Sequence, residues 1–107
     1  MARPKNRSES RRLSLGDDLR IARAAEVTNL LASACDAGSV EIEAAQVERV
    51  DAAGLQALVV GIARLRKAKV ARHWAGVSPT LAAAAALAGL VEALEISGVP
   101  DLLGPSR

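Results

Sequence analysis

The strongest constraint on the fold is the alternation of short strand-like runs with longer helical ones along the chain. In residues 39–44, apolar side chains occupy every second position and glutamates lie between them, which is typical of a strand with one buried face. In residues 55–65, apolar side chains recur with the spacing of one helical face. Because parallel neighbouring strands need helical crossovers, this order predicts an α/β domain with a four- to five-stranded mixed sheet flanked by amphipathic helices.

The same two periodicities predict the remaining elements. We expect two short strands over residues 13–15 and 19–21, joined by a turn, and then a helix over 24–37. Further along the chain we expect a strand over 70–76, a helix over 79–88 and a short final helix or strand over 90–96. Ser78 has the position of an N-cap, Pro79 that of a first helical residue and Gly89 that of a residue past the helix end. His73 and Trp74 adjoin in a strand and therefore face opposite sides, with Trp74 expected in the core.

The length of 107 residues suits one small domain. We expect a basic, flexible N-terminal arm over residues 1–11, the domain over 12–96 and a C-terminal tail over 97–107. The arm could bind phosphates of nucleic acid or of acidic lipid, and nucleic-acid binding is an alternative function from another class. It has no aromatic residue for base stacking, however, so a solvated terminus is favoured and a nucleic-acid partner is not expected.

Several other classes of protein are disfavoured by the composition. No apolar run approaches the roughly 20 residues that cross a bilayer, and the N-terminus lacks the apolar stretch of a secretory signal, so a cytoplasmic location and no membrane span are expected. Cys35 is the single cysteine and is expected as a small core residue. No motif brings His73 together with Asp51, Ser78 or Cys35, and no metal-ligand spacing is present. We therefore expect no catalytic residue, no metal and no cofactor.

The segment "VERVDAAGLQALVV", residues 47–60, is the candidate functional region. An extended run ends at Val50 and a helix begins near Ala52, so Asp51 is expected as the N-cap of that helix. Gly54 falls in the first turn, where alanine would be favoured by up to about 1 kcal/mol. Some group should therefore approach the backbone closely at Gly54. The residues leave three choices: a neighbouring strand of the same chain, a partner protein, or a phosphate drawn to the helix N-terminus.

The helix after this loop offers a second candidate feature. Gln56, Ala57, Val60, Gly61 and Arg64 lie off its main apolar stripe and could form a shallow apolar patch with a polar rim. Alternatively, the helix is buried on more than one face, as nearly all-apolar helices usually are. Both interpretations remain open from the sequence.

The order of "VERVDAAGLQALV", "GVSPTL" and "LAGLVEAL" resembles the STAS domain family of bacterial anti-sigma factor antagonists and related regulators. The likeness extends from about Leu13 to Ile96. It implies a non-enzymatic protein-interaction module in signal transduction and transcription regulation. Its loop of Asp51, Ala52, Ala53 and Gly54 would bind or regulate a partner together with the helix residues Gln56, Ala57, Val60 and Arg64.

The resemblance also implies a control that this chain lacks. In sigma-regulating members, a serine or threonine of the loop is phosphorylated by a partner kinase, but Ala52 and Ala53 have no hydroxyl. The expected partner is an anti-sigma factor or kinase, or a sensor of a chemotaxis or two-component system. The alternative is the ATPase subunit of a phospholipid ABC transporter, and a homodimer is also compatible with the sequence.

Overall fold

The computed structural model describes residues 9–96 of the chain. In chain order the elements are β1 (Ser10–Ser14), β2 (Asp18–Leu19), η1 (Ile21–Arg23), α1 (Ala24–Ala32), β3 (Ser39–Ala44), β4 (Arg49–Val50), α2 (Ala52–Lys67), β5 (Ala71–Val77), α3 (Pro79–Leu87) and α4 (Val91–Leu94). β1 thus begins inside the expected arm, while residues 1–8 of that arm and the whole expected tail, 97–107, lie outside the described residues. Within 9–96, no helix is both long and apolar enough to cross a membrane.

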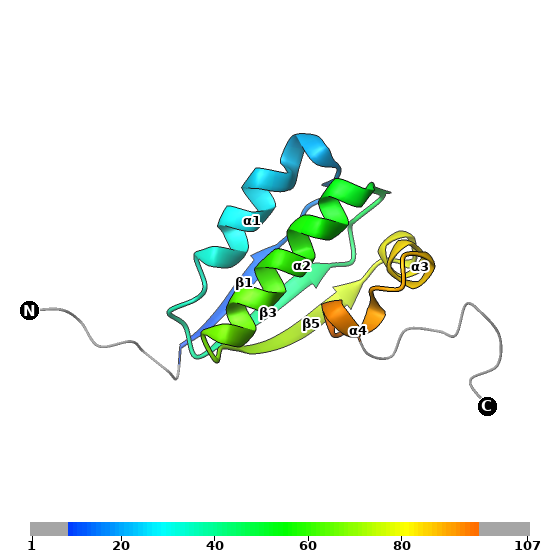
Figure 1. Cartoon of the computed structure of the whole chain (residues 1–107). Helices are drawn as coiled ribbons and strands as arrows, with labels where there is room; N and C mark the ends of the chain where they lie inside the picture. The colour runs from blue at the N-terminus through cyan, green and yellow to red at the C-terminus, as the bar shows by residue number, and fades with distance from the viewer. Residues whose placement is uncertain (1–8, 97–107) are drawn as a thin grey trace, which may run out of the picture.

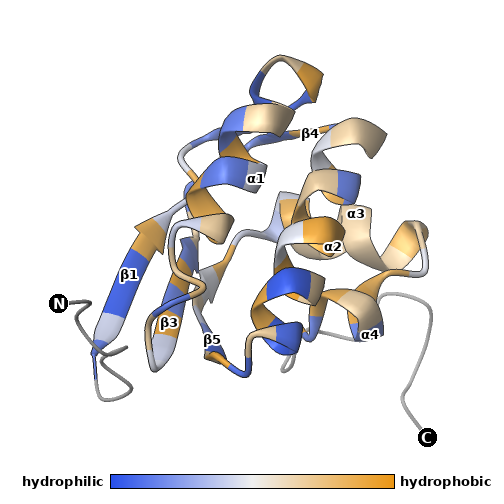
Figure 2. Cartoon of the chain, turned by 60° about the vertical axis from the view of Figure 1, so that its left-hand side comes forward, coloured by the Kyte–Doolittle hydropathy of each residue, from blue (hydrophilic) through white to orange (hydrophobic). Residues whose placement is uncertain are grey.

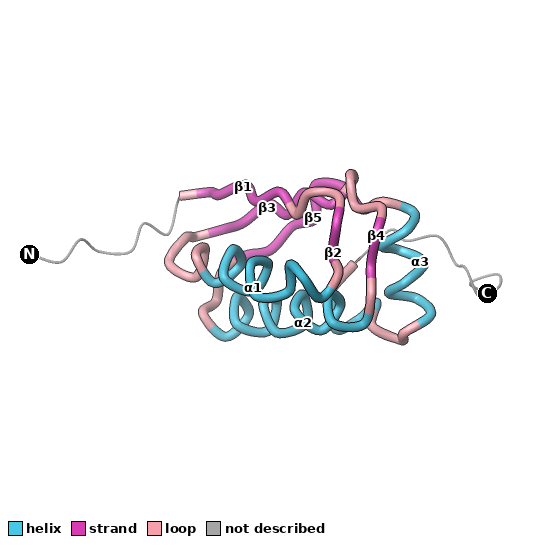
Figure 3. The backbone as a smooth tube through the Cα atoms, turned by 90° about the horizontal axis from the view of Figure 1, so that it is seen from above, coloured by secondary structure: helices cyan, strands magenta, loops and turns pink. Residues whose placement is uncertain are grey.

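The described strands form two parallel sheets, one of three strands and one of two. β3 lies between β1 and β5, and its Ile42 pairs in register with Leu13 on one side and Trp74 on the other. β2 pairs only with β4. The α/β class is confirmed, but these five strands are all parallel and form two sheets instead of one mixed sheet. After the left-handed Gly16 (φ 75°), β2 leaves the sheet and runs toward the helices, so it cannot pair with β1 (Figure 3).

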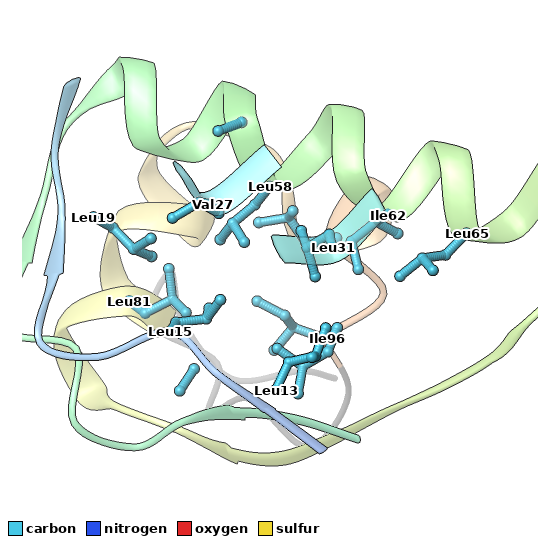
Figure 4. Packing of buried hydrophobic residues seen from close by; sticks show 14 of the residues in the cluster. Leu13, Leu15, Leu19, Val27, Leu31, Leu58, Ile62, Leu65, Leu81 and Ile96 are labelled. Atoms are coloured by element: carbon cyan, nitrogen blue, oxygen red, sulfur yellow. The ribbon is translucent and has the colours of Figure 1, made fainter. Parts of the chain in front are cut away.

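Helices α1 and α2 lie side by side on one face of the three-stranded sheet (Figure 1). Leu13 and Ile42 from the sheet, Leu31 from α1, and Leu58 and Ile62 from α2 are all buried. Figure 4 shows how such apolar side chains fill the space between the helix and the strands. The core contains no phenylalanine or tyrosine and is built largely from Leu, Ile, Val and Ala, as the composition predicts.

No described element covers the other face of the sheet, which is polar (Figures 2 and 3). Arg12, Glu41 and His73 form one cross-strand row on it. The Arg12 guanidinium contacts the Glu41 carboxylate at 3.0 Å and that of Glu43 at 3.9 Å. The prediction that Glu41 and Glu43 line a solvated face is therefore confirmed, with Val40 and Ile42 buried on the opposite face.

The predicted signals at the ends of α3 are confirmed. The Ser78 hydroxyl accepts the N–H of Leu81 at 3.0 Å, and Pro79 is the first residue of the helix. Gly89 follows the end of α3 with a left-handed φ of 71°. Ser78 is buried, so helix capping accounts for its hydroxyl.

A cluster of two arginines and one glutamate holds α4 against the domain. The Glu95 carboxylate accepts hydrogen bonds from both Arg72 on β5 and Arg66 on α2. The indole N–H of Trp74 also donates to the Leu94 carbonyl at 2.9 Å. The hydrogen bonds from Arg72 and Arg66 outweigh burial and lower the pKa of Glu95. Charge-assisted contacts thus fix a short helix that has few hydrogen bonds of its own.

We expect Glu95→Gln to lower the free energy of unfolding by about 1–2 kcal/mol at pH 7, since it removes charge-assisted hydrogen bonds. Because the folded state depresses the pKa of Glu95, its contribution is present above the usual value of 4.5 and is lost as the pH falls through the lower folded value. Urea denaturation of both proteins from pH 7 to pH 3 tests this. The control is Glu92→Gln, which changes an exposed glutamate of the same helix. Equal losses of unfolding free energy in Glu95→Gln and Glu92→Gln would show that the hydrogen bonds of Glu95 with Arg66 and Arg72 do not stabilise the fold.

Candidate functional site

The Asp51 carboxylate joins the starts of two helices. One oxygen, Oδ1, accepts the N–H of Gly54 in the first turn of α2 at 2.9 Å. The other, Oδ2, accepts the N–H of Ile21 at the start of η1, also at 2.9 Å. The predicted N-cap is confirmed, and the bond to Ile21 is an addition that sequence spacing does not reveal. The two N–H donors, with Gly54 first, lower the pKa of Asp51 because they stabilise its charged form.

Gly54 is buried under the backbone of β2. A Cβ at this position would overlap the carbonyl oxygen of Leu19, which also accepts the N–H of Asp51 at 3.2 Å. Of the three groups that the sequence leaves open, the one that approaches Gly54 is therefore a strand of the same chain. Gly54 is the buried residue of the loop, whereas Ala52 is exposed and Asp51 and Ala53 are partly exposed.

Two arginines hold the segment that leads from β2 into η1. Arg20 forms a bidentate ion pair with Asp18, with both N–O distances 2.9 Å. This hydrogen-bonded pair lowers the pKa of Asp18. Arg23 donates to the carbonyls of Leu15 at 2.8 Å and Asp18 at 3.0 Å. The backbone on the Ile21 side of the loop is thus tied to the rest of the domain.

The outer face of α2 is narrower than the sequence predicts. Gln56, Val60 and Arg64 are exposed, as expected for a surface patch. The placement of Ala57 and Gly61 on that outer side is wrong, because both are buried. A Cβ on Gly61 would overlap Leu31 of α1, so this glycine lets the two helices pack closely. The helix is therefore covered on part of its circumference and open on the rest.

Ile21 is an exposed apolar residue at the site that sequence reasoning missed. The alternation around it predicts a strand residue, but Ile21 begins η1 and is 71% exposed. Its N–H is donated to Asp51, which turns the chain away from β2. Three of the large hydrophobic residues between 9 and 96 are exposed: Ile21, Val60 and Leu87. The sequence contains one signal against a strand at Ile21. The next alternate position is Arg23, so the apolar alternation ends at Ile21.

The polar residues that the sequence offers as catalytic candidates lie in separate parts of the described structure. His73 lies on the open face of the sheet, Asp51 caps α2 and Ser78 caps α3, and no hydrogen bond within residues 9–96 connects them. No cluster of three or more His, Cys, Asp or Glu side chains in this range could hold a metal ion. The loop presents Ala52 and Ala53, whose methyl groups can pack against another surface but cannot accept a phosphoryl group.

Comparison with protein families finds a match to the family described as "Mlab, STAS domain" over residues 3–103. The chain therefore belongs to the STAS domain family, as its resemblance predicts. Searches of curated proteins and of solved structures found no match. STAS domains generally mediate protein–protein interactions.

We expect Gly54→Ala to reduce stability by about 1–3 kcal/mol, because the added methyl group would overlap a backbone oxygen that cannot move independently. Thermal and urea denaturation measure the loss. Ala52→Ser is the matched control in the same loop, and because Ala52 is exposed we expect a change within about 0.5 kcal/mol. Wild-type stability of Gly54→Ala would show that β2 and α2 do not pack as described.

We expect Asp51→Asn to weaken the junction between the starts of η1 and α2 at pH 7. An amide has one acceptor oxygen, whereas the carboxylate has two. Amide hydrogen exchange measured by NMR should speed up at Ile21, at Gly54 or at both. The lowered pKa of Asp51 means that its stabilisation is present above the usual value of 3.8 and is lost as the pH falls through the folded value. The difference between wild type and variant should therefore shrink in acid. If the difference in amide exchange between wild type and Asp51→Asn did not change with pH, the ionised carboxylate of Asp51 would not be what stabilises the two helix starts.

Proposed function

We propose that this STAS domain is a non-catalytic protein-recognition module that docks a partner protein through the loop after Asp51 and the exposed face of α2. The observation that supports this most directly is the combination of a rigidly capped loop with an exposed alanine and an exposed helix face. Asp51 is engaged on both oxygens, so the loop offers a fixed shape. Ala52, Gln56 and Val60 are exposed beside it.

The leading candidate is a bacterial regulator that resembles anti-sigma factor antagonists and binds an anti-sigma factor, kinase or sensor. Because Ala52 and Ala53 have no hydroxyl, phosphorylation of this loop cannot release the partner. Binding would therefore be constitutive with respect to that modification. A phosphate in the same place would add nearly two negative charges next to the Asp51 carboxylate, which is the repulsion that regulated members would exploit.

A second candidate is the STAS subunit of a phospholipid ABC transporter, whose partner is the ATPase subunit. The loop of two alanines supports it equally, because a permanent subunit needs no phosphorylation switch. Both candidates use the same docking surface, and both place the protein in the cytoplasm or at the inner face of a membrane. They differ in the protein that would co-purify.

The test is affinity purification of the tagged full chain from its native host, with the retained proteins identified by mass spectrometry. Ala52→Glu should reduce retention about tenfold or more, since it places a charge on the proposed contact without disturbing the core. Ala75→Glu is the matched control, because Ala75 is an exposed alanine of β5 and belongs neither to the loop nor to α2. An anti-sigma factor, kinase or sensor would identify the first candidate and an ABC ATPase the second. Equal retention by wild type and Ala52→Glu would contradict docking at the loop.

Incubation with the retained protein and ATP then separates the two candidates further. If that protein is a STAS-directed kinase, Ala53→Ser should take up phosphate at residue 53 and wild type should take up none. If it is a transporter ATPase, neither protein should be labelled. Phosphate on another residue of the wild-type chain would overturn the conclusion that its binding is not controlled by phosphorylation.

A further inference from the structure

We infer that the docking surface has two chemically different ends and fits an acidic protein surface that carries an apolar pocket. The apolar end consists of Ile21, Ala22 and Ala52, and the cationic end consists of Arg64, Lys67 and Lys69. This inference rests on the proposed function and adds to it the anchor residue, Ile21, and the charge of the partner.

The apolar end brings together two segments that lie far apart in the sequence. Ile21 donates its N–H to the side chain of Asp51, the residue directly before Ala52, so η1 and the first turn of α2 adjoin. Ile21 is 71% exposed, and Ala22 and Ala52 are exposed as well. A β-branched side chain whose backbone N–H is bonded to Asp51 can enter a partner's pocket and loses little conformational freedom when it does so.

The exposed face of α2 connects the two ends. Gln56, Val60, Arg64 and Lys67 follow one another at intervals of four, four and three residues, which places them along one side of the helix. Val60 is 41% exposed at the middle of this line. Twelve residues separate Ala52 from Arg64, or about 18 Å along the axis, so a single partner surface can contact both ends.

The cationic end carries charges that the domain itself does not neutralise. Six arginines of the described range form ion pairs with carboxylates: Arg11, Arg12, Arg20, Arg23, Arg66 and Arg72. Within residues 9–96, the side chains of Arg64, Lys67 and Lys69 form no ion pair or hydrogen bond, and all three are exposed. The α2 dipole stabilises cations at this position. Because no described side chain pairs with these three cations, their charges are available to a partner. Figure 2 shows this hydrophilic end of α2 next to α4.

The chemistry of the two ends favours an acidic protein over nucleic acid. A polyanion would neutralise the cationic end but would leave Ile21 in water, and the surface offers no aromatic ring for base stacking. A protein with carboxylates at one end of its interface and an apolar pocket at the other satisfies both ends. Its charges would steer association, and the pocket around Ile21 would set the rate of dissociation.

The test uses the purified protein that the wild-type chain retains from its native host, with association and dissociation rates measured at 50 mM and 300 mM salt. Ile21→Ser should weaken the equilibrium affinity about tenfold or more, mainly through faster dissociation. Its control is Leu87→Ser, which alters an 81% exposed leucine of α3.

The double variant Arg64→Gln/Lys67→Gln should slow association about threefold or more at low salt and flatten its salt dependence. Its control is Arg49→Gln, an exposed arginine of β4. Circular dichroism confirms that each variant is folded.

The outcomes separate this inference from the proposed function. If wild type retains a protein but Ile21→Ser and the double variant bind it like wild type, the two-ended surface is wrong and the proposed function stands. If wild type retains no protein, the proposed function fails and this inference fails with it. Retention that nuclease abolishes would identify nucleic acid as the occupant. A wild-type dimer in light scattering that Ile21→Ser converts to monomer would identify a second copy. Either of these last two results would overturn an acidic protein partner.

Discussion

The contact between the Leu19 carbonyl and the first turn of α2 sets the arrangement of the remaining structure. It requires a residue without a Cβ, and Gly54 meets that requirement. The same carbonyl accepts the N–H of Asp51, whose carboxylate then reaches both Gly54 and Ile21. The starts of η1 and α2 therefore lie next to each other, held by β2, Gly54 and Asp51. Helices α1 and α2 form a single layer on the sheet.

This junction gives the two faces of the domain different properties. The side of the domain formed by η1, α1 and α2 combines buried leucines with the exposed Ile21 and with the exposed cations Arg64 and Lys67. The opposite sheet face is polar, and its Arg12 is already paired with Glu41 and Glu43. A partner on the sheet face would meet charges that are already paired within the chain, whereas on the helix face Arg64 and Lys67 form no ion pair with a described residue.

Membership of the STAS family and the chemistry of the loop support one view of regulation. A loop with Ala52 and Ala53 cannot be charged by phosphoryl transfer, so in the proposed function the binding surface does not change with the activity of a kinase. Control would then depend on the amount of partner or on competition for the same surface.

The sequence by itself determined the α/β class, the approximate positions of α1, α2, α3, β3 and β5, and the caps made by Asp51 and Ser78. These depend on periodicity and on hydrogen bonds within a few residues, which are local properties of the chain. Tertiary structure alone decided that β2 pairs with β4, that a strand covers Gly54, that Ala57 and Gly61 are buried, and that Ile21 is exposed. Each of these depends on which distant backbone approaches a given position, and one helical or strand periodicity is compatible with several such approaches.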